Sequence, residues 1–200
     1  MIPFTKIQFN LPNILSGARF VLTPPLLFLL AVFYQGNAAK EITLQGFLIL
    51  LIFSIIVSSD IFDGIAARKL NIQSETGRQF DILADFFYRF LLILYFCIEG
   101  DIHYSFLFIF TLIFLLFISG FIPFRIFKSK GILYYSGKSV PVAVTILIGA
   151  LLLKRILPEV YILFVVTYYL KYAVYLISFI ALMIKLVFYD DKSWRITDID

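Results

Sequence analysis

The sequence is poor in residues that cross-link a chain or bind soft metals. Among its 200 residues it has one cysteine, Cys97, and one histidine, His103. A lone cysteine excludes an intramolecular disulfide and, without partners, a thiolate metal site. Only 15% of the residues are charged. The chain also lacks internal repeats and Pro-, Gly- or Ser-rich linkers, so a second domain is not expected.

Long apolar runs take the place of these residues. Hydrophobic residues make up 62% of the chain, and its mean hydropathy is +0.97. A bilayer core of ~30 Å needs about 20 apolar residues per helix. The sequence therefore predicts one all-α integral membrane domain over residues 1–200. Its six transmembrane helices are expected at roughly 13–35, 41–62, 79–98, 103–124, 140–157 and 160–188, followed by a cytoplasmic tail at 189–200.

The first apolar run is expected to be a retained helix. Arg19 and the pair Pro24-Pro25 interrupt it, and no Ala-x-Ala-like cleavage site follows, unlike a signal peptide. Residues 1–10 contain Lys6 together with the apolar residues Ile2, Phe4, Ile7 and Phe9. They are equally compatible with an amphipathic segment at the membrane surface and with a frayed terminus.

The basic residues predict the orientation. The net charge of +4 could suggest a nucleic-acid partner, but the distribution of charge explains it without one. With six spans and both termini on one side, eleven of the seventeen Lys and Arg residues fall on the face where residues 60–85 lie. Only Lys40, Lys154 and Arg155 fall on the other face, and the remaining three lie inside the spans. By the positive-inside rule the first face is cytoplasmic.

Four carboxylates interrupt the apolar sequence as two close pairs. They belong to the pattern Asp60-x2-Asp63-Gly64-x2-Ala67-Arg68-x8-Gly77-x3-Asp81-x3-Asp85. Residues three or four apart share a helix face, so a hairpin between the second and third spans would bring the two acid pairs together. Ionisable groups at membrane depth are costly and indicate a functional site. Four oxygen donors of this kind would suit one or two Mg²⁺ or Mn²⁺ ions.

The other four motif residues suit a phosphate ligand. Gly64, Gly77 and Ala67 keep the surface beside the acids small, and Arg68 offers a planar donor fork to a phosphate oxygen. Together they indicate a slot for a nucleotide diphosphate. The structural alternative is that the acids only form ion pairs with arginines, namely Arg68, Arg78 and Arg89.

The complete pattern resembles the signature of the CDP-alcohol phosphotransferases, membrane enzymes of phospholipid synthesis. The resemblance implies a six-helix membrane fold, commonly a homodimer, with a cytoplasm-facing di-metal site. It implies that Asp60, Asp63 and Asp81 hold the metals, and that Asp85 is the catalytic base and can also touch a metal. The residues implied to line the CDP pocket are Gly64, Ala67, Arg68 and Gly77.

Outside the motif, the resemblance points to one branch of this family. The run from Asn10 to Arg19 looks like the start of bacterial phosphatidylglycerophosphate synthases. Arg125 and Lys138 fall where that branch has an Arg and a Gly-Lys pair, and they are candidates for binding an acceptor phosphate. The sequence departs from the branch at Phe86, because the branch has a lysine at that position. It also departs at Ile126 and Val140.

The expected activity is metal-dependent transfer of a phosphatidyl group from CDP-diacylglycerol to glycerol 3-phosphate in the bacterial inner membrane, releasing CMP. Because of the departures, phosphatidylglycerol, inositol phosphate, serine and choline stay open as acceptors. A small cation transporter is a remote alternative, because the chain has one acidic cluster and no counterpart in its second half.

Three further polar residues have less defined places in the prediction. His103 falls on the far side from the acids, so it is not expected to be their base. Arg19 could reach the donor, whereas the role of Lys171 inside the last span stays undecided between a polar cavity, a dimer interface and a tilted helix.

Overall fold

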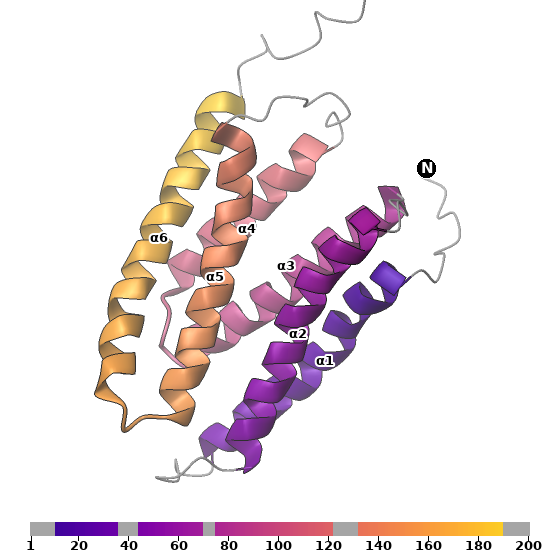
Figure 1. Cartoon of the computed structure of the whole chain (residues 1–200). Coiled ribbons are helices and arrows are strands. Elements are labelled where there is room, and N and C mark those ends of the chain that lie inside the picture. Colours follow the sequence, from indigo (N-terminus) through magenta and orange to yellow (C-terminus); the bar gives the residue numbers. More distant parts are fainter. Residues whose placement is uncertain (1–10, 36–43, 70–74, 122–131, 190–200) are drawn as a thin grey trace, which may run out of the picture.

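The chain forms a bundle of antiparallel helices (Figure 1). The computed structural model describes residues 11–35, 44–69, 75–121 and 132–189. Every regular element among them is an α-helix, so the predicted all-α class is confirmed for this part of the chain. The helices are α1 (Leu11–Gln35), α2 (Leu44–Lys69), α3 (Glu75–Ile98), α4 (Tyr104–Phe121), α5 (Ile132–Ile156) and α6 (Tyr161–Tyr189).

The helix boundaries follow the predicted spans except at two places. The second helix, α2, continues to Lys69, past the predicted end at 62, and α5 starts earlier than predicted. The prediction placed a basic loop at residues 124–139, but α5 already begins at Ile132. The helix opens with the apolar and aromatic run Ile-Leu-Tyr-Tyr. The prediction left this run out because it counted only the residues needed to cross the membrane. Lys138 therefore lies on a helix and not on a loop.

Four of the described helices have the length and apolar composition needed to cross a membrane. These segments are Ile14–Val32, Leu44–Phe62, Ser139–Ile156 and Tyr161–Ile184. In α3 the charged residues lower the hydropathy, and the part of α4 whose side chains are described, Tyr104–Leu116, is apolar. The protein is thus a multi-pass membrane protein, and six crossings remain a prediction.

The bundle core lies between α1, α2 and α3 on one side and α4, α5 and α6 on the other. Leu26, Ile56 and Leu92 are completely buried in it. Gly149 of α5 lets α2 approach closely, because a Cβ there would lie 3.3 Å from the Phe53 ring. Small residues at such contacts bring helices together in lipid, where packing replaces the hydrophobic effect as the attractive force.

A charged network ties the helices together where α3 ends. Gly100, at φ +79°, turns the chain out of α3, and the next residue, Asp101, accepts hydrogen bonds from Arg155 Nη2 at 2.7 Å and Lys154 Nζ at 3.1 Å. Lys171 Nζ donates to the backbone oxygen of Asp101 at 3.0 Å. The cation of Lys171 therefore meets the α3–α4 turn at this end of the bundle.

Candidate active site

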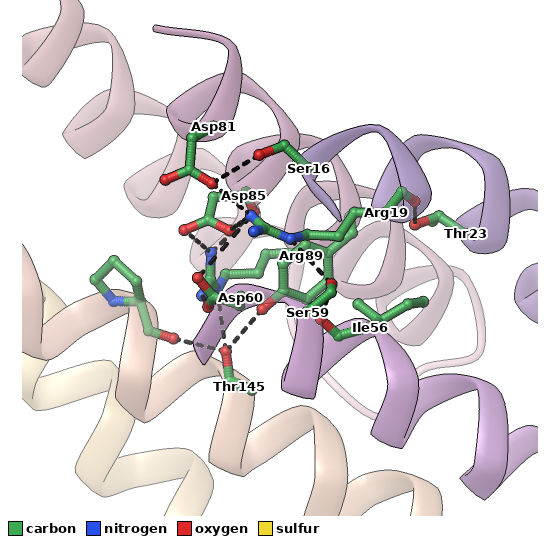
Figure 2. A network of polar contacts seen from close by, with 12 residues as sticks. Ser16, Arg19, Thr23, Ile56, Ser59, Asp60, Asp81, Asp85, Arg89 and Thr145 are labelled. Carbon is green, nitrogen blue, oxygen red and sulfur yellow. Dashed lines mark hydrogen bonds and ion pairs between the residues drawn. The ribbon is translucent and has the colours of Figure 1, made fainter. Parts of the chain in front are cut away.

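Three of the four motif acids meet at the other end of α3. Asp60 lies towards the end of α2, whereas Asp81 and Asp85 lie one turn apart near the start of α3. Because α2 and α3 run in opposite directions and both pack on α1, the acids come close to one another and are joined through Arg19 and Arg89 (Figure 2). Their side chains are 30%, 40% and 27% exposed respectively, so the acids form a partly open surface.

The guanidinium of Arg19, from α1, lies against all three acids. Its Nη1 is 3.0 Å from Asp81 Oδ1 and 3.9 Å from Asp60 Oδ1, and it forms a close ion pair with Asp85 Oδ1. The Arg19 side chain is completely buried. A buried guanidinium is tolerated only when it is paired, so the acids stabilise Arg19 as much as Arg19 neutralises them.

A second buried arginine, Arg89, joins two of the same acids one turn further along α3. Its Nη2 donates to Asp60 Oδ2 at 3.0 Å, and its Nη1 is 3.1 Å from Asp85 Oδ2. Arg89 also donates to the Asp85 backbone oxygen and to Thr145 Oγ1, both at 3.0 Å. The planar fork of arginine suits such multiple pairing. Arg89 thereby links α2, α3 and α5.

Neutral hydroxyl groups complete the network. Ser16 Oγ donates to Asp81 Oδ1 at 3.2 Å, and Ser59 Oγ accepts from Arg19 Nε at 3.3 Å. On the α5 side, Thr145 Oγ1 donates to the backbone of Pro141 and also meets Tyr88 Oη at 3.2 Å. These bonds orient the charged side chains through hydroxyl groups on α1, α2 and α5.

The structure brings together Asp60, Asp81 and Asp85, as their spacing predicted. The other motif side chains, those of Asp63, Gly64, Ala67 and Arg68, lie outside the described residues. So do the Lys138 side chain and the whole of Arg125. Gly77 lies half-buried on the first turn of α3. His103 lies beyond the opposite end of α3, where its Nδ1 meets Ser105 Oγ at 2.8 Å.

The structural alternative, pairing of acids with arginines, also holds in part. Arg89 makes the predicted kind of ion pair, whereas the side chains of Arg68 and Arg78 lie outside the described residues. Sequence reasoning missed Arg19 as a partner of the acids. Its position was a usable signal, because a charged residue inside an apolar helix requires a buried counter-ion.

The described acids have the right chemistry for a hard divalent cation, but a guanidinium occupies their meeting point. Within the described part of the chain, no three acidic, His or Cys side chains are placed to hold an ion as they stand. Carboxylate oxygens are the ligands that Mg²⁺ and Mn²⁺ prefer. The three oxygens gathered around Nη1 of Arg19 already mark a position that suits positive charge.

Comparison with known proteins places this site in a family. The family model for CDP-alcohol phosphatidyltransferase matches residues 9–189, which include all three clustered acids and both arginines. The chain is 36% identical over 80 residues to a CDP-diacylglycerol–glycerol-3-phosphate 3-phosphatidyltransferase of Rickettsia felis, covering 40% of each chain.

Two further relatives carry the same name. The Escherichia coli K12 protein is 35% identical over 79 residues, covering 40% of this chain and 39% of its own. The Aquifex aeolicus protein is 34% identical over 85 residues, covering 42% of each. These matches span about two fifths of the relatives' length, whereas the family model spans nearly the whole chain. The chain therefore belongs to the CDP-alcohol phosphatidyltransferase family.

Proposed function

We propose that this protein transfers a phosphatidyl group from CDP-diacylglycerol to glycerol 3-phosphate, releasing CMP. The observation that carries the proposal is the convergence of Asp60, Asp81 and Asp85 on one cationic group at a partly exposed end of the bundle. A reaction on phosphates needs concentrated positive charge. An acid cluster that gathers cations meets this need, and family membership supports the same chemistry.

We further propose that the acids hold Mg²⁺ or Mn²⁺, with two ions per site. Asp60, Asp63, Asp81 and Asp85 would be their ligands. When bound, such ions offset negative charge on the phosphates of the donor. The small motif residues and the arginine beside them, Gly64, Ala67, Arg68 and Gly77, would bind the CDP part of the donor.

Asp85 is the proposed general base, accepting the proton of the acceptor hydroxyl. Its carboxylate is 27% exposed and held by Arg19 and Arg89, so it is both accessible and oriented. Asp85→Asn should lower kcat by about 10²–10⁴-fold, the usual contribution of a general base. Donor binding should persist. Near-normal turnover of this variant would contradict the assignment.

The acceptor is proposed from the names of the relatives and from basic residues. Three relatives are named as enzymes that use glycerol 3-phosphate. Arg125 and Lys138 would share the phosphate of such an acceptor. Arg125→Ala and Lys138→Ala should then raise KM for glycerol 3-phosphate far more than KM for the donor. Equal changes in both would mean that these residues do not bind the acceptor.

The deciding experiment uses the purified full-length protein and follows release of CMP from CDP-diacylglycerol. Glycerol 3-phosphate, phosphatidylglycerol, inositol phosphate, serine and choline are supplied in turn, with Mg²⁺, with Mn²⁺ and with a chelator. Release only with glycerol 3-phosphate and only with a divalent ion is expected. Release with a different alcohol would overturn the acceptor, and full activity in the chelator would overturn the metal.

The proposed setting is a homodimer in the bacterial inner membrane, with six helices crossing and the acid end facing the cytoplasm. Single cysteines at positions 75 and 103 mark the two ends of α3. In intact cells, a membrane-impermeant thiol reagent should label position 103 and not position 75. The reverse pattern would overturn the orientation. Native Cys97 is buried and serves as the unlabelled background.

A further inference from the structure

The position that suits a metal ion is held by a side chain of the protein itself. Nη1 of Arg19 lies within 3.9 Å of an oxygen of each of the three acids (Figure 2). The arginine is completely buried, whereas the acids are 27–40% exposed. Arg19 thus approaches the acids from inside the bundle, and their other side stays open to an incoming ion.

The two buried arginines differ in how they are anchored. Arg89 lies on the same helix as Asp85, and it also bonds that residue's backbone and Thr145. Arg19 comes from α1, and its Nη1 spans Asp81 and Asp85 across the boundary between α1 and α3. A divalent ion that used the oxygens of Asp81 and Asp85 would therefore meet Arg19 directly.

From this geometry we infer that Arg19 is a built-in counter-ion of the acid cluster, which a divalent cation displaces from Asp81 and Asp85 when it binds. The inference rests on the proposed metal-dependent function. Its physical basis is that like charges cannot share the same ligands at contact distance. Before the metal binds, Arg19 offsets repulsion among the carboxylates. Arg19 therefore stabilises the metal-free protein and weakens metal binding.

The inference predicts that loss of this charge tightens metal binding. Even in a strongly screened site, removing a unit charge about 4 Å from a divalent ion should raise its affinity at least about tenfold. Arg19→Gln should therefore bind Mn²⁺ more tightly than wild type. Arg19→Lys, which keeps the charge, should stay near the wild-type value.

A second, milder variant tests the competition between Arg19 and the metal ion independently. Ser59→Ala removes the acceptor of the Arg19 Nε hydrogen bond, at 3.3 Å, without changing any charge. Arg19 is then held less firmly, so Mn²⁺ should bind about threefold more tightly. Arg155→Gln is the control, because it removes an arginine that pairs with Asp101 at 2.7 Å, near the opposite end of α3. It should leave Mn²⁺ affinity unchanged.

The experiment titrates Mn²⁺ into purified, chelator-treated full-length protein and measures free Mn²⁺ by electron paramagnetic resonance. Thermal unfolding with and without Mn²⁺ verifies that each variant is folded. Metal-free Arg19→Gln should unfold at a lower temperature than wild type, and saturating Mn²⁺ should restore more of its stability. These measurements do not depend on catalytic activity.

The outcomes separate the two proposals. Equal or weaker Mn²⁺ binding by Arg19→Gln and Ser59→Ala, with wild type binding Mn²⁺ and releasing CMP, would overturn the inference about Arg19 alone. Absence of Mn²⁺ binding in wild type and in every folded variant would overturn the metal site together with this inference. If Arg155→Gln also bound Mn²⁺ more tightly, the tighter binding would be explained by net charge alone, and the inference about Arg19 would be overturned.

Discussion

Arg89 offers the sharpest test of how the acid cluster is held together. Arg89→Met keeps much of the apolar stem but removes the guanidinium, which bonds Asp60 at 3.0 Å and Thr145 at 3.0 Å. Removing one partner of a buried ion pair costs about 3–5 kcal/mol. The acids are about 30% exposed and Arg19 remains beside them, so a discounted cost of about 2–3 kcal/mol is expected.

The assay is unfolding of the detergent-solubilised protein by sodium dodecyl sulfate, followed by circular dichroism in the presence of a chelator. The partner variant Asp60→Asn completes a double-mutant cycle, in which a coupling free energy of about 1–2 kcal/mol with Arg89→Met is expected. Arg89→Lys, which keeps the charge but cannot reach both acids, should fall between wild type and Arg89→Met.

Two results would refute this reasoning. A cost below about 0.5 kcal/mol for Arg89→Met would place it among ordinary surface substitutions. A coupling free energy near zero with Asp60→Asn would mean that the 3.0 Å contact contributes nothing beyond the packing of the side chain.

Two further predictions concern other parts of the bundle. Burial raises the pKa of Asp101, but hydrogen bonds and charge from Arg155 and Lys154 lower it more, to below its ordinary 3.8. The stability that ionised Asp101 contributes is therefore complete above pH 3.8 and is lost as the pH falls through the lower folded-state pKa. The difference in unfolding free energy between wild type and Asp101→Asn should shrink over that window, and a constant difference would contradict it. Gly149→Leu should destabilise the protein by about 1–3 kcal/mol through overpacking, because even a Cβ there lies 3.3 Å from Phe53. Gly149→Ala should stay within about 1 kcal/mol of wild type, since the helix propensity of alanine offsets the contact. Equal stability of both variants by the same unfolding assay would show that this contact is not tight.

Much of the fold was predictable because its signals are local. Apolar runs of membrane length end close to the ends of the observed helices, as for α1 and α6. The exceptions are the end of α2 at Lys69 and the start of α5 at Ile132, which both lie outside the most apolar stretch of the helix. Hydropathy marks the part of a helix that suits the membrane core, but a helix continues wherever its backbone hydrogen bonds can still form.

The meeting of the acids was also predictable, since it depends on spacing along two neighbouring helices. Asp81 and Asp85 are four residues apart, and a hairpin must bring α2 beside α3. The predicted use of these acids by metal ions is a separate matter, which the Mn²⁺ titration tests. The position of Arg19 inside an apolar helix signalled that it needs a counter-ion, but no local pattern identified Asp85, 66 residues away, as that partner.

The amino-acid sequence alone determined that this is a helical membrane protein with a clustered acid motif, because hydropathy and i to i+4 spacing are properties of short segments. Only the tertiary structure decided which cations meet those acids. Arg19 and Arg89 reach them from different helices, and Arg155 reaches Asp101 across 54 residues. Buried charges take whichever counter-ion the packing brings within contact distance, and helix packing is a property of the whole bundle.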